Sequence, residues 1–170
     1  LGGNGQYSFR LSTGQLFASS APGAPRDLLQ KGESVRSATF SRDGALLAVG
    51  MASGRLRVVE SAGGTTRFET DDLESPLFAL AFDGEGRRLA SGGADGRLRL
   101  YELASPRADR SGIDAHAGPV FSLDVSPDGS RLVSTGADGA ARVWAWGAGH
   151  APLSTLEGEA DRVRDARFSD

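Results

Sequence analysis

Apolar and polar residues alternate in short runs along most of this chain, which is the period-two pattern typical of β-strands. In residues 120–125, Phe121, Leu123 and Val125 share one strand face, while Ser122 and Asp124 share the other. No segment carries an apolar stripe with the 3.6-residue period of a helix. The pattern therefore predicts an essentially all-β protein.

The alternating runs recur at a nearly constant interval. Runs beginning at Val35, Leu77, Val120 and Val163 are separated by 42, 43 and 43 residues. Each complete copy has two turn glycines 10 residues apart, namely Gly44 and Gly54, Gly86 and Gly96, and Gly129 and Gly139. Asp-Gly pairs suit such turns because they tolerate the positive φ of tight hairpins. A period of this size indicates one supersecondary unit per repeat, stacked on its neighbours.

Each repeat is predicted to hold four antiparallel strands, which is the composition of a β-propeller blade. The predicted inner strands are 35–40, 77–82 and 120–125, and the second strands are 46–50, 88–92 and 131–135. The third strands are 55–60, 97–101 and 140–145, and weaker fourth strands follow at 65–69, 109–113 and 153–156. The complete blades are therefore residues 35–76, 77–119 and 120–162.

The two ends of the chain fit the same frame as parts of blades. Residues 1–34 correspond to a blade without its inner strand, with further strands at 7–9, 15–18 and 27–30. Residues 163–170 correspond to the inner strand of a further or ring-closing blade, and the step from Val163 round to Val35 is again 42. One expectation is that strand 163–168 joins residues 6–30 and so closes a small ring within the chain. The favoured one is that these roughly four repeats form a fragment of a larger propeller, with self-association through open blade ends possible.

Composition narrows the classes of function. The 170 residues are 39% hydrophobic and 24% charged, which is typical of a globular chain. A net charge of −3 argues against a nucleic-acid partner, because there is no basic excess to displace counterions. The absence of cysteine excludes disulfides, thiolate metal sites and a cysteine nucleophile. No apolar run approaches the ~18 residues of a membrane span, so we expect no membrane partner.

Several segments in register resemble the WD-repeat (WD40) β-propeller family. The most specific are 40–44, 91–102, 125–129 and 134–144, which include Val125-Ser-Pro-Asp-Gly129 and Ser134-Thr-Gly-Ala-Asp138-Gly139. The signature dipeptides of the family are eroded: its Trp-Asp position reads Val59-Glu60, Tyr101-Glu102 and Trp144-Ala145, and its Gly-His position reads Ala115-His116. The resemblance covers nearly the whole chain and implies a rigid interaction scaffold.

The resemblance also assigns a structural role to His116, Ser134, Asp138 and Trp144. In the family, these residue types at these positions form a buried hydrogen-bonded tetrad that ties the strands of one blade together. His116, Ser134 and Asp138 also suggest a Ser-His-Asp catalytic triad, a less favoured interpretation. The middle blade keeps Ser91, Asp95 and Tyr101 without a histidine. The first blade has Val49, Ser53 and Val59 at these positions and therefore has no tetrad. The first and middle blades should depend more on apolar packing.

A second candidate site is the second residue of each inner strand: Arg36, Phe78, Phe121 and Arg164. In the family, the starts of these strands lie near one mouth of the central channel. Aromatic and arginine side chains often carry the binding energy of protein interfaces, so these four residues are a candidate binding patch. The alternative is that Phe78 and Phe121 pack between blades.

No metal or cofactor is predicted, because the Asp-Gly turns lack the alternating acidic ligands of a calcium loop. The predicted function is a non-catalytic scaffold that binds other proteins or peptides, in the cytoplasm. One alternative is the regulatory propeller portion of a larger signalling enzyme, a kinase or protease, whose catalytic domain lies outside this chain. A propeller hydrolase with its site on the channel face is a third possibility.

Overall fold

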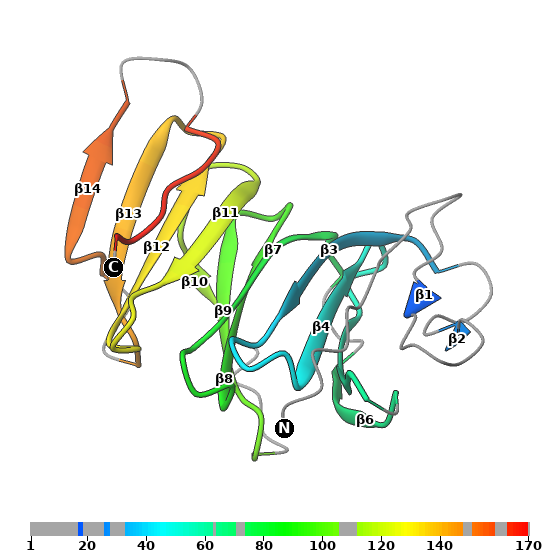
Figure 1. The fold of residues 1–170 in the computed structure, drawn as a ribbon. Coiled ribbons are helices and arrows are strands. Elements are labelled where there is room, and N and C mark those ends of the chain that lie inside the picture. The colour runs from blue at the N-terminus through cyan, green and yellow to red at the C-terminus, as the bar shows by residue number, and fades with distance from the viewer. Residues whose placement is uncertain are drawn as a thin grey trace.

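The computed structural model describes residues 33–62, 64–70, 74–105, 112–147, 151–158 and 163–169, and the backbone of residues 17–18 and 26–27. Every regular element among them is a β-strand, and twelve of the strands form three four-stranded antiparallel sheets (Figure 1). Within this part of the chain there is no helix that could cross a membrane. The predicted all-β propeller fold is confirmed.

Each four-stranded sheet is one blade, with its strands in chain order. The first blade contains β3 (Val35–Phe40), β4 (Leu46–Met51), β5 (Leu56–Glu60) and β6 (Thr66–Thr70). The second contains β7 (Leu77–Phe82), β8 (Arg88–Gly93), β9 (Arg97–Glu102) and β10 (Ile113–Asp114). The third contains β11 (Val120–Val125), β12 (Arg131–Gly136), β13 (Ala140–Ala145) and β14 (Ser154–Glu157).

The predicted inner, second and third strands agree with these bounds to within one residue. The fourth strand is less regular: β10 has two residues and overlaps the predicted range 109–113 only at Ile113, while 109–111 lie outside the described residues. At the chain ends, β1 (Phe17–Ala18) pairs antiparallel with β2 (Arg26–Asp27). The rest of the predicted N-terminal partial blade lies outside the described residues, so the domain boundaries stay a prediction.

Side chains within the turns explain the repeated Asp-Gly pairs. In the turn between β3 and β4, Asp43 accepts hydrogen bonds from the Ser41 hydroxyl (2.6 Å) and the Ala45 amide (3.0 Å), and Gly44 has a φ of 71°. Asp128 does the same between β11 and β12, where bonds from Ser126 and Ser130 lower its pKa to about 2. These carboxylates are used by the turns, and no group of three potential metal ligands occurs among the described residues.

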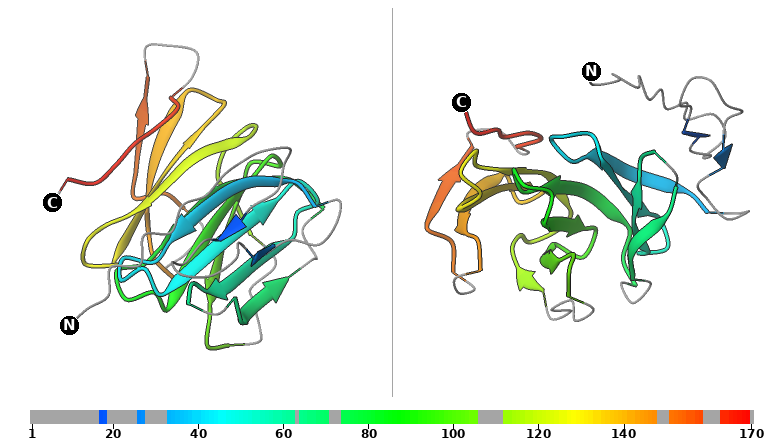
Figure 2. Two further views of the ribbon diagram at one scale, coloured as in Figure 1. Left: turned by 45° about the vertical axis from the view of Figure 1, so that its right-hand side comes forward. Right: turned by 60° about the horizontal axis from the view of Figure 1, so that its bottom comes forward.

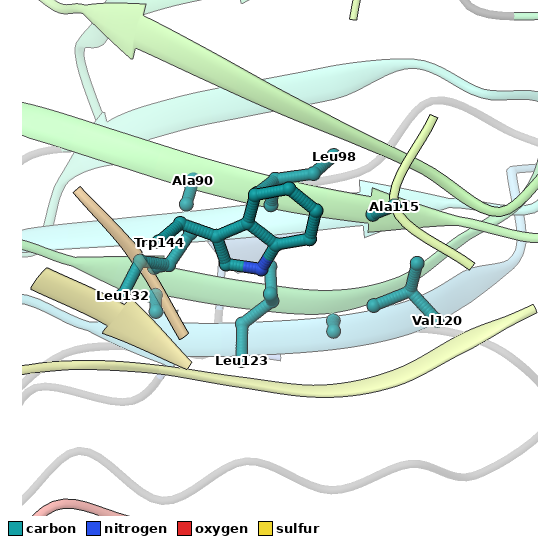
Figure 3. Packing of buried hydrophobic residues seen from close by; sticks show 9 residues of the cluster. Ala90, Leu98, Ala115, Val120, Leu123, Leu132 and Trp144 are labelled. Atoms are coloured by element: carbon teal, nitrogen blue, oxygen red, sulfur yellow. The ribbon is translucent and has the colours of Figure 1, made fainter. Parts of the chain in front are cut away.

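The blades pack face to face with their inner strands side by side (Figure 2). Each sheet has an upstream face, towards the preceding sheet, and a downstream face, towards the following one. Small residues dominate the downstream faces and large ones the upstream faces. Between blades two and three the buried cluster joins downstream Ala79, Ala81, Ala90 and Leu98 to upstream Val120, Leu123, Leu132 and Trp144 (Figure 3). Between blades one and two it joins downstream Ala48, Leu56 and Val58 to upstream Leu77, Leu80, Leu89 and Tyr101.

Candidate functional site

The four predicted tetrad residues come together between blades two and three. His116 lies in the segment between β10 and β11, Ser134 in β12, Asp138 in the following turn and Trp144 in β13. His116 Nε2 is 2.8 Å from Ser134 Oγ, and His116 Nδ1 is 2.8 Å from Asp138 Oδ1. Trp144 Nε1 donates to Ser134 Oγ at 2.9 Å. The four side chains therefore form one continuous hydrogen-bonded chain.

The chemistry of the donors sets the direction of that chain at its Trp144 end. The indole N–H of Trp144 can only donate, so Ser134 Oγ accepts that hydrogen bond and its own hydroxyl can donate to His116 Nε2. His116 Nδ1 faces two groups of opposite kind: the Asp138 carboxylate at 2.8 Å, which can only accept, and Arg142 Nη1 at 2.6 Å, which can only donate. Burial, only partly offset by Asp138, lowers the pKa of His116 and favours the neutral ring. Burial alone would raise the pKa of Asp138, but hydrogen bonds from His116 and Arg142 outweigh it and hold the pKa well below its usual range.

A close backbone approach makes room for the His116 ring. A Cβ atom built on Gly136 would lie 2.3 Å from His116 Cγ, so only glycine lets the imidazole sit against β12. Beneath it, the Trp144 ring is packed among Leu98, Leu123 and Leu132 (Figure 3). Ser134 is completely buried and its hydroxyl is shared by Trp144 and His116. A substrate cannot reach this hydroxyl, so the arrangement is unsuited to nucleophilic catalysis.

Arg142 is a member of this cluster that the sequence analysis missed. Its Nη1 donates to Asp138 Oδ2 at 2.7 Å and lies beside the His116 ring. Equivalent arginines occur in the other blades, where Arg99 donates to Asp95 at 2.6 Å and Arg57 donates to Glu69 at 2.8 Å. The signal was present in the sequence, because Arg57, Arg99 and Arg142 recur at steps of 42 and 43.

The other two blades have reduced versions of the network. In the second blade, Ser91 Oγ lies 3.1 Å from the Tyr101 hydroxyl, and burial raises the pKa of Tyr101 to about 12. In the first blade, Val49 and Val59 replace the polar pair and belong to a buried apolar cluster with Leu47 and Met51. Polar cross-links are thus concentrated between blades two and three.

The candidate binding residues occupy one repeated structural feature. The register of each inner strand shifts between its first and third residues, so Arg36, Phe78 and Phe121 are each the extra residue of a β-bulge. Arg36 and Arg164 are exposed, and Phe78 and Phe121 are half-buried. Neither phenylalanine belongs to the buried apolar clusters among the described residues. The starts of β3 and β7 lie together, because Ser37 Oγ donates to the Leu77 carbonyl at 2.9 Å.

A cavity of about 410 Å³ lies at the other end of the inner strands. The last residues of the strands, at repeat steps of 42, 43 and 43, line it: Phe40, Phe82, Val125 and Phe168. All four are half-buried. Arg42 and Arg167 are at its rim. The sequence analysis placed no site here, although the recurring apolar residue at this position was visible.

Comparisons with known proteins agree with this architecture. Residues 67–102 and 110–145 match the family profile described as WD domain, G-beta repeat. Each match begins within or just before the fourth strand of one blade and ends with the third strand of the next. These two segments therefore carry WD40 repeats, the repeat of a β-propeller family whose usual role is protein interaction and whose members are generally non-catalytic.

One similar solved structure is titled Crystal Structure of Mitotic Checkpoint Complex. Its matching chain is 20% identical, with a TM-score of 0.77 over 88% of the present chain and 48% of the other. This likeness shows the fold, and the present chain spans about half the length of that propeller chain. No curated protein sequence matches.

Proposed function

We propose that this chain is a non-catalytic scaffold that binds a protein or peptide where the inner strands begin. The observation that carries the proposal is the β-bulge repeated at Arg36, Phe78 and Phe121. A bulge removes a residue from the alternation of the strand and re-aims its side chain. Three blades therefore present a side chain at the same end of adjacent strands.

The chemistry of the patch suggests the kind of partner. Two half-buried aromatic rings lie in the inner strands between the exposed guanidinium groups of Arg36 and Arg164. Neither arginine forms an ion pair with a described residue. Rigid aromatic side chains and exposed arginines suit a partner that offers an apolar side chain flanked by carboxylates. The similar chain noted above was itself solved within a protein complex, which agrees with a protein partner.

Burial of the arrangement of Ser134, His116 and Asp138 supports a non-catalytic role. Ser134 is completely buried, and both hydrogen-bonding neighbours of its hydroxyl are fixed. The cluster ties β12, β13 and the segment before β11 together, and its role is to hold the platform rigid. A preformed platform binds with little backbone movement, which limits the entropy lost on association.

Selection of displayed random peptides against the 170-residue chain tests the proposal. Selected peptides are titrated against the parent chain, the double variant Phe78→Ala/Phe121→Ala, and the control Leu153→Ala, which removes an exposed leucine of the outer region. We expect the double variant to lose about tenfold or more in affinity while the control is unchanged. Peptides that bind the double variant as tightly as the parent chain, or failure to select any peptide, would contradict the proposal.

A further inference from the structure

The cavity of about 410 Å³ lies where the inner strands end, opposite the bulges at which they begin. In β7, Phe78 is the bulge residue and Phe82 is the last residue, about 13 Å further along at the rise of a β-strand. The volume of the cavity is within the range of small-molecule sites, which is about 300–1,000 Å³. The two ends of the same strands therefore offer two separate surfaces.

Three apolar side chains in the wall of this cavity are each held from behind by a different buried cluster. Phe40 packs against the cluster of the first blade, and Phe82 packs against the cluster between blades one and two. Val125 packs against the cluster between blades two and three. All three are half-buried and line the cavity. The apolar wall is therefore formed before any ligand enters, which limits the entropy lost on binding.

The turns that follow these strands determine how open the cavity is. The second residue of each turn is Arg42, Gly84 or Pro127, at repeat steps of 42 and 43. A Cβ atom on Gly84 would lie 3.4 Å from the Pro127 carbonyl oxygen, so the second and third turns approach each other closely. Neither of these two residues has a long side chain that could cover the opening, whereas Arg42 has one. The first blade therefore places a guanidinium group at the rim of an open cavity.

The charged groups of the cavity wall differ in what they already bind. The Asp83 carboxylate accepts hydrogen bonds from the Arg88 side chain at 2.9 Å and from two backbone amides. The Asp124 carboxylate accepts a hydrogen bond from the Phe168 amide at 2.8 Å. The side chain of Arg42 is exposed and has no hydrogen bond or ion pair within the part of the chain that the structure describes. The wall therefore has its carboxylates occupied and a cation to spare.

Arg167 is a second guanidinium group at the rim. Its side chain is 62% exposed, and it lies 3.2 Å from Asp165 and 3.9 Å from Asp124. Exposed ion pairs of this kind contribute little energy, so they can rearrange when an anion enters. A guanidinium group presents forked N–H donors that match the two oxygens of a carboxylate. The rim is therefore suited to a carboxylate, next to an apolar wall.

A second cavity, of about 400 Å³, adjoins the first and limits the charge of a ligand. The two cavities share Arg42 and the turn residues Gly84 and Pro127. The wall of the second cavity also contains Glu85 and Asp128, which are both exposed. A second negative group on a ligand held by Arg42 would face these carboxylates, and like charges repel. The two cavities together therefore favour a single carboxylate over a dicarboxylate or a phosphate dianion.

We infer that the cavity of about 410 Å³, the strand-end site, binds a small monocarboxylate with an aromatic or branched apolar body. The apolar body lies against Phe40, Phe82 and Val125, and the carboxylate accepts hydrogen bonds from Arg42. The strand-end site is separate from the proposed protein-binding patch and does not depend on it. It gives the scaffold a small-molecule ligand in addition to a protein partner.

Titration of the isotope-labelled 170-residue chain with hydrocinnamate, followed by NMR, is the first test. We expect saturable shifts of the Phe82 and Gly84 amides but not of the Phe78 amide, with a dissociation constant of about 1 mM or below. Hydrocinnamamide has the same body without the charge, and phenylsuccinate adds a second carboxylate. Each should bind about tenfold more weakly or worse. Absence of saturable shifts, or equal binding of either compound, would overturn the inference.

Two variants locate the ligand in the cavity. Arg42→Gln should weaken hydrocinnamate binding by about tenfold or more, because it removes the charge that holds the carboxylate. Arg67→Gln is the matched control, since this arginine is 62% exposed and lies on β6, outside the cavity wall. Gly84→Leu should block the opening, and the fold tolerates it because a Cβ atom there meets only the Pro127 carbonyl oxygen. Equal effects of the two arginine variants, or unchanged binding to Gly84→Leu, would contradict the strand-end site.

Two further titrations separate this site from protein binding. The double variant Phe78→Ala/Phe121→Ala should bind hydrocinnamate as tightly as the parent chain, because both substitutions lie at the other end of the inner strands. The capped dipeptide acetyl-Phe-Glu-amide carries the same ring and carboxylate on a peptide backbone, and we expect it to bind more weakly than hydrocinnamate. Loss of hydrocinnamate binding in the double variant would overturn the location of the site. Tighter binding of the dipeptide would overturn the small-molecule assignment in favour of an acidic protein segment.

Discussion

The guanidinium group of Arg88 in the second blade lies over the indole ring of Trp146 in the third, 4.7 Å from the ring centre. Arg88 also donates to Asp83 Oδ2 (2.9 Å) and to the Gly129 carbonyl (2.9 Å). One side chain thus joins a carboxylate of its own blade to the backbone and an aromatic ring of the next. It complements the apolar contacts between blades two and three at the end of the strands opposite His116.

We expect Arg88→Ala to lower the free energy of unfolding by about 1–3 kcal/mol, measured by urea denaturation. The loss combines the cation–π contact, the bond to Gly129 and the unpaired carboxylate of Asp83, whose side chain is 4% exposed. Arg87→Ala is the control, because the neighbouring arginine is 78% exposed and its one ion pair among the described residues is with exposed Glu85. Equal losses in the two variants would show that the contact between the blades contributes nothing measurable.

Ser134→Ala should destabilise the chain more than Ser91→Ala, although both serines are fully buried at equivalent repeat positions. Removing the Ser134 hydroxyl leaves two buried groups without a partner, the Trp144 N–H and His116 Nε2, and should cost about 2–4 kcal/mol. Removing the Ser91 hydroxyl leaves only the Tyr101 hydroxyl, for about 1–2 kcal/mol. Urea titrations of the two variants measure the difference. A Ser91 variant that loses as much as the Ser134 variant would contradict the tetrad as the stronger cross-link.

The sequence predicted the blades well because strand alternation and turn glycines are local signals repeated three times. It also placed Ser134, Asp138 and Trp144 around His116, since family positions fix their strands, but it missed Arg142. β10 was predicted poorly because an outer strand is only partly buried, so its pattern is weakly constrained. The bulges at Arg36, Phe78 and Phe121 depend on pairing with a second strand and leave no mark on alternation. The contact between Arg88 and Trp146 joins two blades through residue types that do not recur as a pair, because the equivalent residues at the first junction are Leu46 and Leu103, so no repeat revealed it.

Gly136→Ala should lower the free energy of unfolding by about 1–3 kcal/mol, the usual cost of overpacking a tight site. The added methyl group would lie 2.3 Å from His116 Cγ, and the ring cannot retreat without losing Ser134 or Asp138. Gly84→Ala is the matched control, because its methyl group would meet only the Pro127 carbonyl oxygen at 3.4 Å. Urea denaturation compares the two variants, and equal effects would mean that the contact with His116 is not the constraint at Gly136.

Stability should fall as the pH drops below about 6.5, the ordinary pKa of histidine, because of His116. Burial lowers the pKa of His116 in the folded chain. Between the folded and the unfolded pKa, the unfolded state therefore binds a proton that the folded state does not bind. Above this pH the imidazole is neutral in both states, and its contribution to the free energy of unfolding no longer changes with pH. Below it, the free energy of unfolding should decrease by up to ~1.4 kcal/mol per pH unit until the folded pKa is reached. Urea titrations from pH 8 to about pH 5 measure this slope.

Two histidine variants assign the slope to a residue. The chain has two histidines, so His116→Gln should flatten the profile in this window while His150→Gln should leave it unchanged. Asp138 does not contribute here, because its pKa is lowered from 3.8 and its stabilising effect is lost only at pH values below that. The positive charge of Arg142 beside the ring also lowers the pKa of His116 and so opposes its protonation. A slope that survives His116→Gln would place the acid sensitivity outside the cluster.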